Sequence, residues 1–245
     1  MPTRLDHLVI LVRDLEEAIV DYGRLGFRVT PGGEHADGLT RNALVPFRDG
    51  TYLELVAFVR PEDGRDNVWG WRGFLPRGGL VDYCAASEGL RAEVERLRGL
   101  GFGVEDLGEG GRRLPDGQEI RWRSAGIRQE GRVLPFLIED LTPRERRVPG
   151  GPAADHPNGA AGISRLEIST PDLGKASRDL ALLIDAPSKT LKLGACEISP
   201  VRQDGERREG PSVIGLSTDA PAGAGDLDPG LSHGARFAFS SGAGA

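Results

Sequence analysis

Leu5–Phe27 reads LDHLVILVRDLEEAIVDYGRLGF, and Leu80–Phe102 reads LVDYCAASEGLRAEVERLRGLGF. Each stretch is a strand-like run followed by an amphipathic helical pattern and then by Leu-Gly-Phe. A gap-free alignment of the two stretches places His7 on Asp82. A β-α unit that occurs twice indicates one barrel or cleft built from two halves. It also puts two side chains that can bind metal at equivalent places.

The composition is that of an ordinary globular protein. With 245 residues, 38% of them hydrophobic, the chain can form one large domain or two small ones with a sizeable core. It contains no run of about 18 apolar residues, and its first residues, MPTRLDHLV, form no apolar signal region. We therefore expect a cytoplasmic protein that does not enter a membrane. The net charge of −6 and the lack of a basic stripe argue against nucleic acid as a partner.

The cysteines and lysines carry little functional signal. Cys84 and Cys196 are far apart in sequence and belong to no CxxC motif, so two buried small hydrophobic residues are expected rather than a disulfide or a ligand pair. The chain has only three lysines, Lys175, Lys189 and Lys192. We interpret the preference for arginine as the coding bias of a GC-rich, bacterial genome.

Residues 1–60 are expected to form a first βαβββ module. The pattern predicts strands at about 5–12, 27–30, 39–47 and 52–59 and a helix at about 14–25. Asp14 is a suitable helix N-cap, and Gly26 is suited to end the helix. The last two strands are joined by Asp49-Gly50, a strong hairpin signal.

Residues 79–149 repeat this order as a second module. Strands are predicted at about 80–85, 102–106, 118–125 and 133–138, with a helix at about 88–99 and a turn at Pro115-Asp116-Gly117. Residues 61–78 are a linker rich in Gly and Pro. Its three aromatic residues either cover a pocket or seal a barrel end: Trp69, Trp71 and Phe74.

Residues 160–218 read as a third, partial module, and residues 219–245 as a low-complexity tail. No fourth copy is evident in the sequence. The unpaired module either packs on the barrel or pairs with its copy in a homodimer, because a free sheet edge needs cover. The predicted fold class is α+β, with tandem βαβββ modules forming a curved, half-open barrel and a third partial βαβββ module beside it.

Five segments, in this order, resemble the vicinal oxygen chelate superfamily, and more narrowly its glyoxalase-like domain proteins. They are LDHLVILVRDLEEA, the stretch 35–42 that ends in GLTRN, DGTYLELVAF, PFLIEDLTPRERRV and HPNGAAGI. The resemblance covers about residues 4–218. The superfamily includes glyoxalase I, extradiol dioxygenases and bleomycin-resistance proteins. The resemblance implies paired modules around a divalent metal, with ligands on the first and fourth strands of each module.

Carried over, this ligand pattern falls on His7 and Glu54 in module one and on Asp82 in module two. The fourth ligand position is occupied by Phe136. Glu139 lies nearby but on the opposite strand face, and a one-residue bulge would be needed to bring it round. The implied cofactor is a divalent metal such as Mn, Fe, Ni or Zn, held by three protein ligands. An iron triad of two His and one carboxylate would need a second inward His where Asp82 stands.

The residues themselves leave alternatives open. His7 and Glu54 either bind a metal or hydrogen-bond each other in a polar cleft. Asp82 is a ligand, a hydrogen-bond acceptor or a base whose pKa burial would raise. It is also suited to capping a backbone turn. Asp82 and Glu54 are the candidate catalytic residues.

Candidate substrate-binding residues lie around this set. Asn42 can both donate to and accept from a carbonyl-bearing ligand, and His35 either faces the ligand or is an exposed turn residue. On one strand, either Arg121 and Arg123 face inward to clamp an anion, or Trp122 does so to stack on an organic ligand. Phe136 and His156 are the remaining candidate substrate-binding residues. His156 either closes over the cleft or anchors the connection to the third module.

Two functions of different classes fit these observations. The first is a glyoxalase-like lyase or isomerase that uses a metal to act on a small oxygenated organic substrate. The second is a metal-free protein that binds or sequesters a small molecule, as bleomycin-resistance proteins do. Nucleotide-binding motifs and a GxSxG nucleophile motif do not occur in the sequence.

Overall fold

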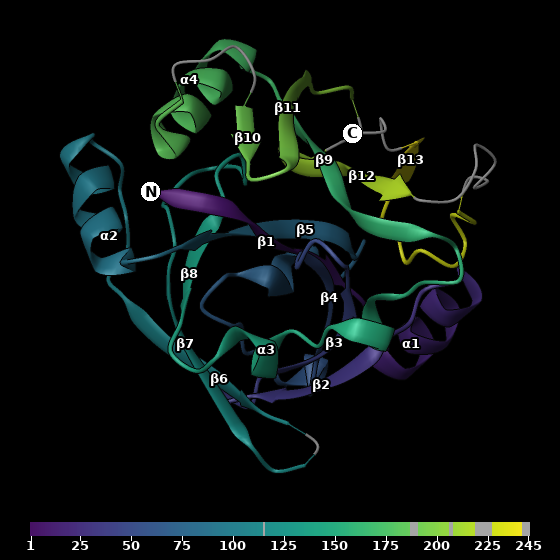
Figure 1. Ribbon diagram of the computed structural model, residues 1–245. Coiled ribbons are helices and arrows are strands. Elements are labelled where there is room, and N and C mark those ends of the chain that lie inside the picture. Colours follow the sequence, from purple (N-terminus) through teal and green to yellow (C-terminus); the bar gives the residue numbers. More distant parts are fainter. Residues whose placement is uncertain (115, 187–190, 206–207, 219–226, 242–245) are drawn as a thin grey trace.

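The computed structural model describes residues 1–114, 116–186, 191–205, 208–218 and 227–241. Two βαβββ modules form a barrel, and a separate five-stranded sheet lies against one side of it (Figure 1). Module one consists of β1 (Pro2–Leu11), α1 (Leu15–Arg24), β2 (Thr30–His35), β3 (Thr40–Pro46) and β4 (Tyr52–Phe58). The fold class is that expected from the repeat.

Module two repeats the order. It consists of β5 (Gly79–Ser87), α2 (Leu90–Gly99), β6 (Gly108–Arg113), β7 (Glu119–Ala125) and β8 (Phe136–Asp140). The linker between the modules carries two short 3-10 helices, Pro61–Asp63 and Trp71–Phe74. After β8 come the single-turn helix α3 (Arg144–Arg147) and a 3-10 turn, Gly151–Ala154. Of the turn predicted at 115–117, Pro115 lies outside the described residues.

The second strand of each module begins later than predicted. We expected strands at 27–30 and 102–106, but β2 begins at Thr30 and β6 at Gly108. Phe27 is instead a buried core residue, and its N–H donates to Tyr22 O as the chain leaves the helix. The Leu-Gly-Phe motif therefore anchors the end of a helix rather than opening a strand.

The eight barrel strands close completely, in the order β1-β4-β3-β2-β6-β7-β8-β5, where a half-open barrel was expected. One junction is the long antiparallel pair β1–β5. The other is short, since β2 and β6 pair only through Glu34 with Arg113 and His35 with Arg112.

The strand register confirms that the two modules are equivalent. In module one, Val9 on β1 lies beside Glu54 on the parallel strand β4. In module two, Cys84 on β5 lies beside Phe136 on β8. Val9 and Cys84 are equivalent positions in the alignment that places His7 on Asp82. Their partners on the parallel strands are therefore equivalent too, so Phe136 occupies the position in module two that Glu54 occupies in module one.

The remaining strands form a second sheet with the order β10-β11-β9-β12-β13. Its strands are β9 (Ala160–Thr170), β10 (Leu191–Leu193), β11 (Cys196–Arg202), β12 (Gly210–Thr218) and β13 (Phe237–Ser241), and α4 (Leu173–Ile184) follows β9. β11 is parallel to β9 as β4 is to β1, and β12 is antiparallel to β9 as β5 is to β1. β13 is parallel to β12 as β8 is to β5. β12 and β13 therefore hold the places of the first and fourth strands of a fourth module, of which the sequence showed no copy. β13 lies within residues 219–245, which we expected to be a low-complexity tail.

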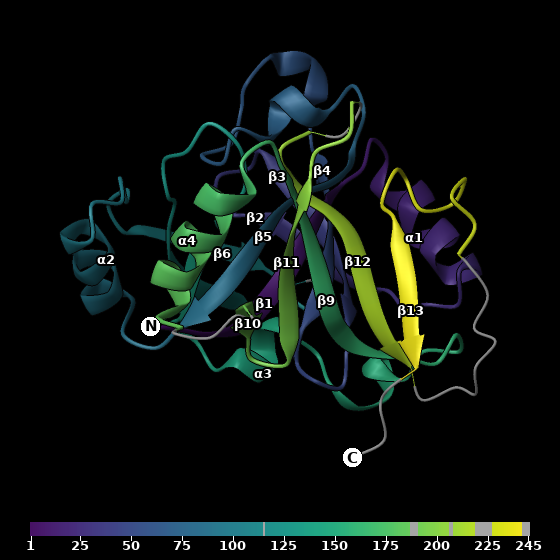
Figure 2. The ribbon, with the colours of Figure 1, turned by 90° about the horizontal axis from the view of Figure 1, so that it is seen from above.

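The second sheet packs against the outside of the barrel (Figure 2). Leu166 and Ile214 from the sheet belong to the same buried cluster as Leu8 and Tyr83 from the barrel. The third module therefore covers its apolar face on the barrel of its own chain. The free thiols of Cys84 and Cys196 are both buried, as predicted. In the part of the chain that is described, no helix has the length and apolar character needed to span a membrane.

Candidate functional site

A cavity of about 210 Å³ lies inside the barrel. This is smaller than the ~300–1,000 Å³ of pockets for drug-sized ligands, so it suits a small molecule. Its polar lining residues include His7, His35, Asn42, Tyr52, Glu54, Arg112 and Arg147. Its apolar lining includes Trp69, Trp71, Trp122, Phe136 and Ile138. Polar groups thus meet an aromatic wall in one cavity.

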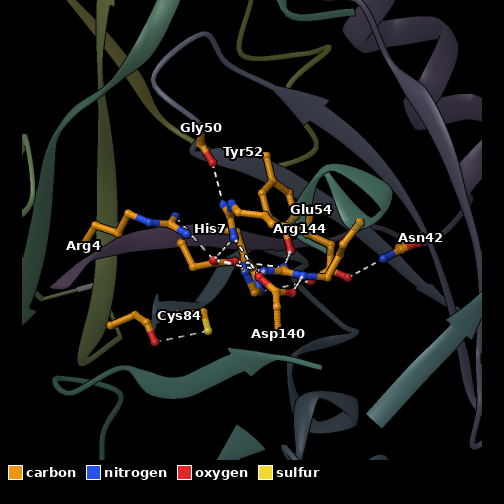
Figure 3. Close-up of polar contacts among 12 residues, drawn as sticks. Arg4, His7, Asn42, Gly50, Tyr52, Glu54, Cys84, Asp140 and Arg144 are labelled. Carbon is orange, nitrogen blue, oxygen red and sulfur yellow. Dashed lines mark hydrogen bonds and ion pairs between the residues drawn. The ribbon is translucent and has the colours of Figure 1, made fainter. Parts of the chain in front are cut away.

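Glu54 is buried and lies between His7 and Asn42 (Figure 3). Its Oε2 lies 3.3 Å from His7 Nε2, and its Oε1 lies 3.4 Å from His35 Nε2. Asn42 Nδ2 donates to the same Oε1 at 2.5 Å. Burial alone would raise the pKa of Glu54, but the hydrogen bonds from His35 and His7 hold this pKa well below its ordinary value. Glu54 is therefore an ionised carboxylate when these contacts are made.

His7 is fixed in orientation by its neighbour in the sequence. Its Nδ1–H donates to Asp6 Oδ1 at 2.8 Å, and its ring stacks on Tyr52 with 4.7 Å between centroids. Burial acts to lower the pKa of His7, yet the hydrogen bonds to Asp6 and Glu54 raise it above its ordinary value. His35 is held similarly, since Nδ1 lies 2.7 Å from Thr40 Oγ1. Both imidazoles thus direct Nε2 at Glu54.

Asp6, which sequence reasoning missed, is completely buried and joins the site to a network of arginines. Arg147 donates to both oxygens of Asp6, at 2.9 and 3.1 Å, and Arg144 also contacts Oδ2. Burial would raise the pKa of Asp6, but Arg147 and His7 hold it well below its ordinary value. The arginines cluster visibly in the sequence at 144–147, but nothing in the local pattern links them to a strand 138 residues earlier.

Of the two orientations considered for β7, the structure has the one in which Trp122 faces the cavity. Trp122 lines the cavity, and its ring centroid lies 6.1 Å from that of His35. Arg121 and Arg123 point outward and pair with Glu109. Opposite Trp122 stands Gly110, where an added Cβ would lie 2.3 Å from Trp122 Nε1. Glycine at this position makes room for the indole.

Asp82 is not brought to His7 and Glu54, although the repeat places it at the equivalent position. It lines a separate pocket, where its Oδ2 accepts from Trp71 Nε1 at 2.9 Å and from Arg132 Nη1 at 2.5 Å. Burial raises the pKa of Asp82 despite the opposing effect of Arg132. The repeat pattern assigned the Asp82 carboxylate to the site with His7 and Glu54. In the structure this carboxylate is instead hydrogen-bonded to the indole of Trp71, which belongs to the linker. Trp69 and Trp71 line the cavity, while Phe74 lies under Arg132.

Phe136 lines the cavity wall, 5.4 Å from the ring of His7 and 4.3 Å from that of Trp69. Glu139 does not replace it. Its Oε1 accepts from Gly89 N at 3.0 Å, at the start of α2 on the outside of the barrel. The fourth ligand position of the superfamily is therefore apolar in this chain.

His156 lies outside the cavity and anchors the connection to the third module. Its Nδ1 accepts from Arg28 N at 2.9 Å, and its Nε2 donates to Pro46 O at 2.8 Å. The ring packs between Phe27 and Phe47. Burial lowers the pKa of His156, so this side chain is a neutral structural bridge.

These contacts do not fit the metal centre that the resemblance implies. Of its four positions, Phe136 has no donor atom, and Asp82 is engaged by Trp71 and Arg132. One group of three potential donors lies within 4.8 Å among the described residues, namely Asp6, His7 and Cys84. Both oxygens of Asp6 are already bonded to arginine, and burial raises the pKa of the Cys84 thiol well above its ordinary value. A cation there would have to displace a buried ion pair.

Two βαβββ modules whose strands close around one polar cavity are the architecture of the vicinal oxygen chelate superfamily. The model of the glyoxalase-like domain family matches residues 5–184. The chain belongs to this glyoxalase-like domain family, a part of that superfamily.

Two of the three solved structures described next share the fold, at low identity. A hypothetical protein from Staphylococcus aureus is 13% identical with a TM-score of 0.76, over 97% of this chain and 98% of that chain. A xylose isomerase-like TIM barrel/4-hydroxyphenylpyruvate dioxygenase fusion protein is 13% identical with a TM-score of 0.54, over 90% of this chain and 37% of that chain. Methylmalonyl-CoA epimerase from Mycobacterium tuberculosis is 27% identical with a TM-score of 0.43, over 57% of this chain and 89% of that chain. No curated protein matches the chain.

Proposed function

We propose that this protein is an enzyme that moves a proton on a small oxygenated organic substrate, in lyase or isomerase chemistry through an enediolate. The observation that carries this proposal is the convergence of two imidazoles on one buried carboxylate at the polar end of a small cavity. Such a cluster supplies an acid and a base within hydrogen-bond reach of one bound molecule.

The two imidazoles control Glu54. They hold its pKa low while they are bonded to it, whereas burial acts in the opposite direction. When a substrate oxygen takes over the Nε2–H of His7, Glu54 loses this stabilisation and its pKa rises. Glu54 then accepts the proton from the hydroxyl-bearing carbon next to the carbonyl and returns it to the former carbonyl carbon. His7 gives its Nε2 proton to the former carbonyl oxygen and takes the proton of the neighbouring hydroxyl in exchange.

His7 stabilises the charge that develops. Asp6 holds its Nδ1–H, so the Nε2–H is directed at the cavity and donates to the enediolate oxygen. Asn42 and His35 keep Glu54 in position from the other side. Because the superfamily's ligand positions do not fit a metal here, this chemistry is assigned to the side chains alone.

The test is carbon-bound hydrogen exchange in D₂O, followed by proton NMR with hydroxyacetone, mandelate and phenylpyruvate. The wild-type protein should speed the loss of the C–H signal of at least one compound. The Glu54→Gln variant should slow this exchange by about 10²–10⁴-fold, as expected for removal of a general base. Exchange at the uncatalysed rate with every compound would contradict the proposal.

A second function, metal-free sequestration, is favoured by a separate observation. Trp69, Trp122 and Phe136 form an aromatic wall in the same cavity. Tight binding of an aromatic compound without exchange or conversion would support this alternative.

A further inference from the structure

Arg112, on β6, is a buried cation beside the cavity. Its side chain is 4% exposed, and it lies opposite His35 in the short pairing that closes the barrel. Antiparallel partners present their side chains on the same face of a sheet, so Arg112 and His35 face the cavity together. Sequence analysis did not single out this residue.

The guanidinium is incompletely paired. Its Nη1 donates to Asn42 Oδ1 at 3.4 Å, and its Nη2 donates to the carbonyl of Arg147 at 2.5 Å. Its Nε has no hydrogen-bond partner, and no carboxylate of the described residues forms an ion pair with it, although Glu54 attracts it from farther away. A buried arginine is normally paired with an anion, because burying a lone charge is unfavourable.

The charged groups around His7 are paired with one another. Asp6 and Asp140 are bonded to Arg147. Glu54 Oε2 lies 3.3 Å from His7 Nε2, and Glu54 Oε1 lies 3.4 Å from His35 Nε2. Arg112 is therefore the positive group at this site whose partner is missing from the described residues.

We propose that Arg112 recognises the carboxylate of the substrate. The cavity then takes small carboxylic acids that carry an oxygen on the adjacent carbon and an apolar, flat tail. The oxygen meets His7 and Glu54, and the tail lies against Trp69, Trp122 and Phe136. This substrate class rests on the proposed function, but the recognition by Arg112 can be measured as binding alone.

The probe pair is phenylglyoxylate and its neutral amide, phenylglyoxamide. Neither has a hydrogen on the carbon next to the acid or amide group, so both report binding without proton transfer. Their affinities are measured by isothermal titration calorimetry at constant ionic strength. The variants are Arg112→Gln, Arg112→Lys and the matched control Arg113→Gln, which removes the exposed neighbour paired with Glu119. Thermal unfolding checks that each variant is folded.

The wild-type protein and Arg113→Gln should bind the carboxylate at least about tenfold more tightly than the amide, as expected for loss of one charge-assisted bond. Arg112→Gln should lose this preference and keep its affinity for the amide. Arg112→Lys, which keeps the charge but not the forked geometry, should lie between them. If Arg112→Gln does not fold, the inference is tested by the preference for the carboxylate over the amide in the wild-type protein and in Arg112→Lys.

Equal wild-type affinities, no binding of either probe, or an unchanged preference in Arg112→Gln would overturn the inference. The proposed proton transfer is judged separately, by hydrogen exchange on neutral hydroxyacetone. Exchange without a carboxylate preference would reject Arg112 recognition alone. A carboxylate preference without exchange on any compound would reject the proton transfer alone.

Discussion

At the scale of single residues, His7, His35, Asn42 and Glu54 form one polar cluster. His7 and Glu54 were predicted because they stand at ligand positions of the superfamily that the sequence resembles. Asn42 and His35 were predicted because they lie at the ends of the stretch that enters the third strand. Asp6 and Arg112 were missed, because the role of each charged side chain depends on partners that are far away in the sequence. Asp82 was predicted by the same repeat but is held by Trp71, which belongs to no repeated unit.

Asp6→Asn should be strongly destabilising. The change leaves Arg147 buried without its main counter-charge, a type of loss that costs about 3–5 kcal/mol. Urea unfolding gives this free energy directly. Glu109→Gln, which breaks an exposed pair with Arg121, is the control and should change stability by less than about 1 kcal/mol. Similar losses in both variants would show that the buried network is not a stabilising feature.

His156 should make the protein less stable in acid. Its pKa is lowered in the folded state, so the unfolded chain binds more protons below its own pKa of about 6.5. The stability that neutral His156 contributes is thus present above about pH 6.5 and is lost as the pH falls through the lowered folded pKa. His156→Gln should show a smaller loss of unfolding free energy than wild type on going from about pH 7.5 to about pH 5.5. An equal loss in both proteins would assign the acid sensitivity to other groups.

At the scale of elements, helix boundaries and hairpins were predicted well because their signals are local. Asp14 caps α1 by accepting from Glu17 N at 3.0 Å, as its position before the apolar pattern indicated. Strand parity on β7 could not be decided from the sequence, because Arg121, Trp122 and Arg123 are suited to either face. The packing decides it through Gly110, which sits across from the indole.

Gly110→Ala should therefore push Trp122 out of its place in the cavity wall. The new Cβ would overlap Nε1 of the indole, and such overpacking costs about 1–3 kcal/mol. Weaker binding of phenylglyoxamide and a changed tryptophan fluorescence spectrum are expected. Gly99→Ala, in an open position at the end of α2, should instead leave both unchanged and stabilise the helix by about 0.5–1 kcal/mol. An unchanged spectrum for Gly110→Ala would contradict the assigned packing.

At the scale of the whole molecule, the paired modules were predicted, and the fourth-module remnant was not. The repeated strands β1 and β5 are each followed by a helix and a Leu-Gly-Phe motif, so their sequences can be aligned. In the described part of the chain, β12 and β13 are two strands without such a helix. Their relationship appears only through strand direction and register, which depend on contacts across the sheet. The same holds for closure of the barrel, which rests on two residue pairs.

The barrel and the second sheet should unfold together, because their apolar side chains form one buried cluster. All three tryptophans lie in the barrel cavity, so their fluorescence reports on the barrel alone. Leu166→Ala, in the sheet, should lower the unfolding free energy by about 2–5 kcal/mol. This loss should be equal by tryptophan fluorescence and by circular dichroism. A fluorescence transition that stays at its wild-type position would show two independent units.

The most direct test of the account is carbon-bound hydrogen exchange in D₂O by protein stripped of metal with a chelator, with its residual metal measured by mass spectrometry. We expect exchange on at least one of the three compounds to persist in metal-free protein and to be lost in Glu54→Gln. Exchange that disappears with the metal and returns when Mn, Fe, Ni or Zn is restored would contradict it. In that case His7 and Glu54 would act as metal ligands rather than as an acid and a base.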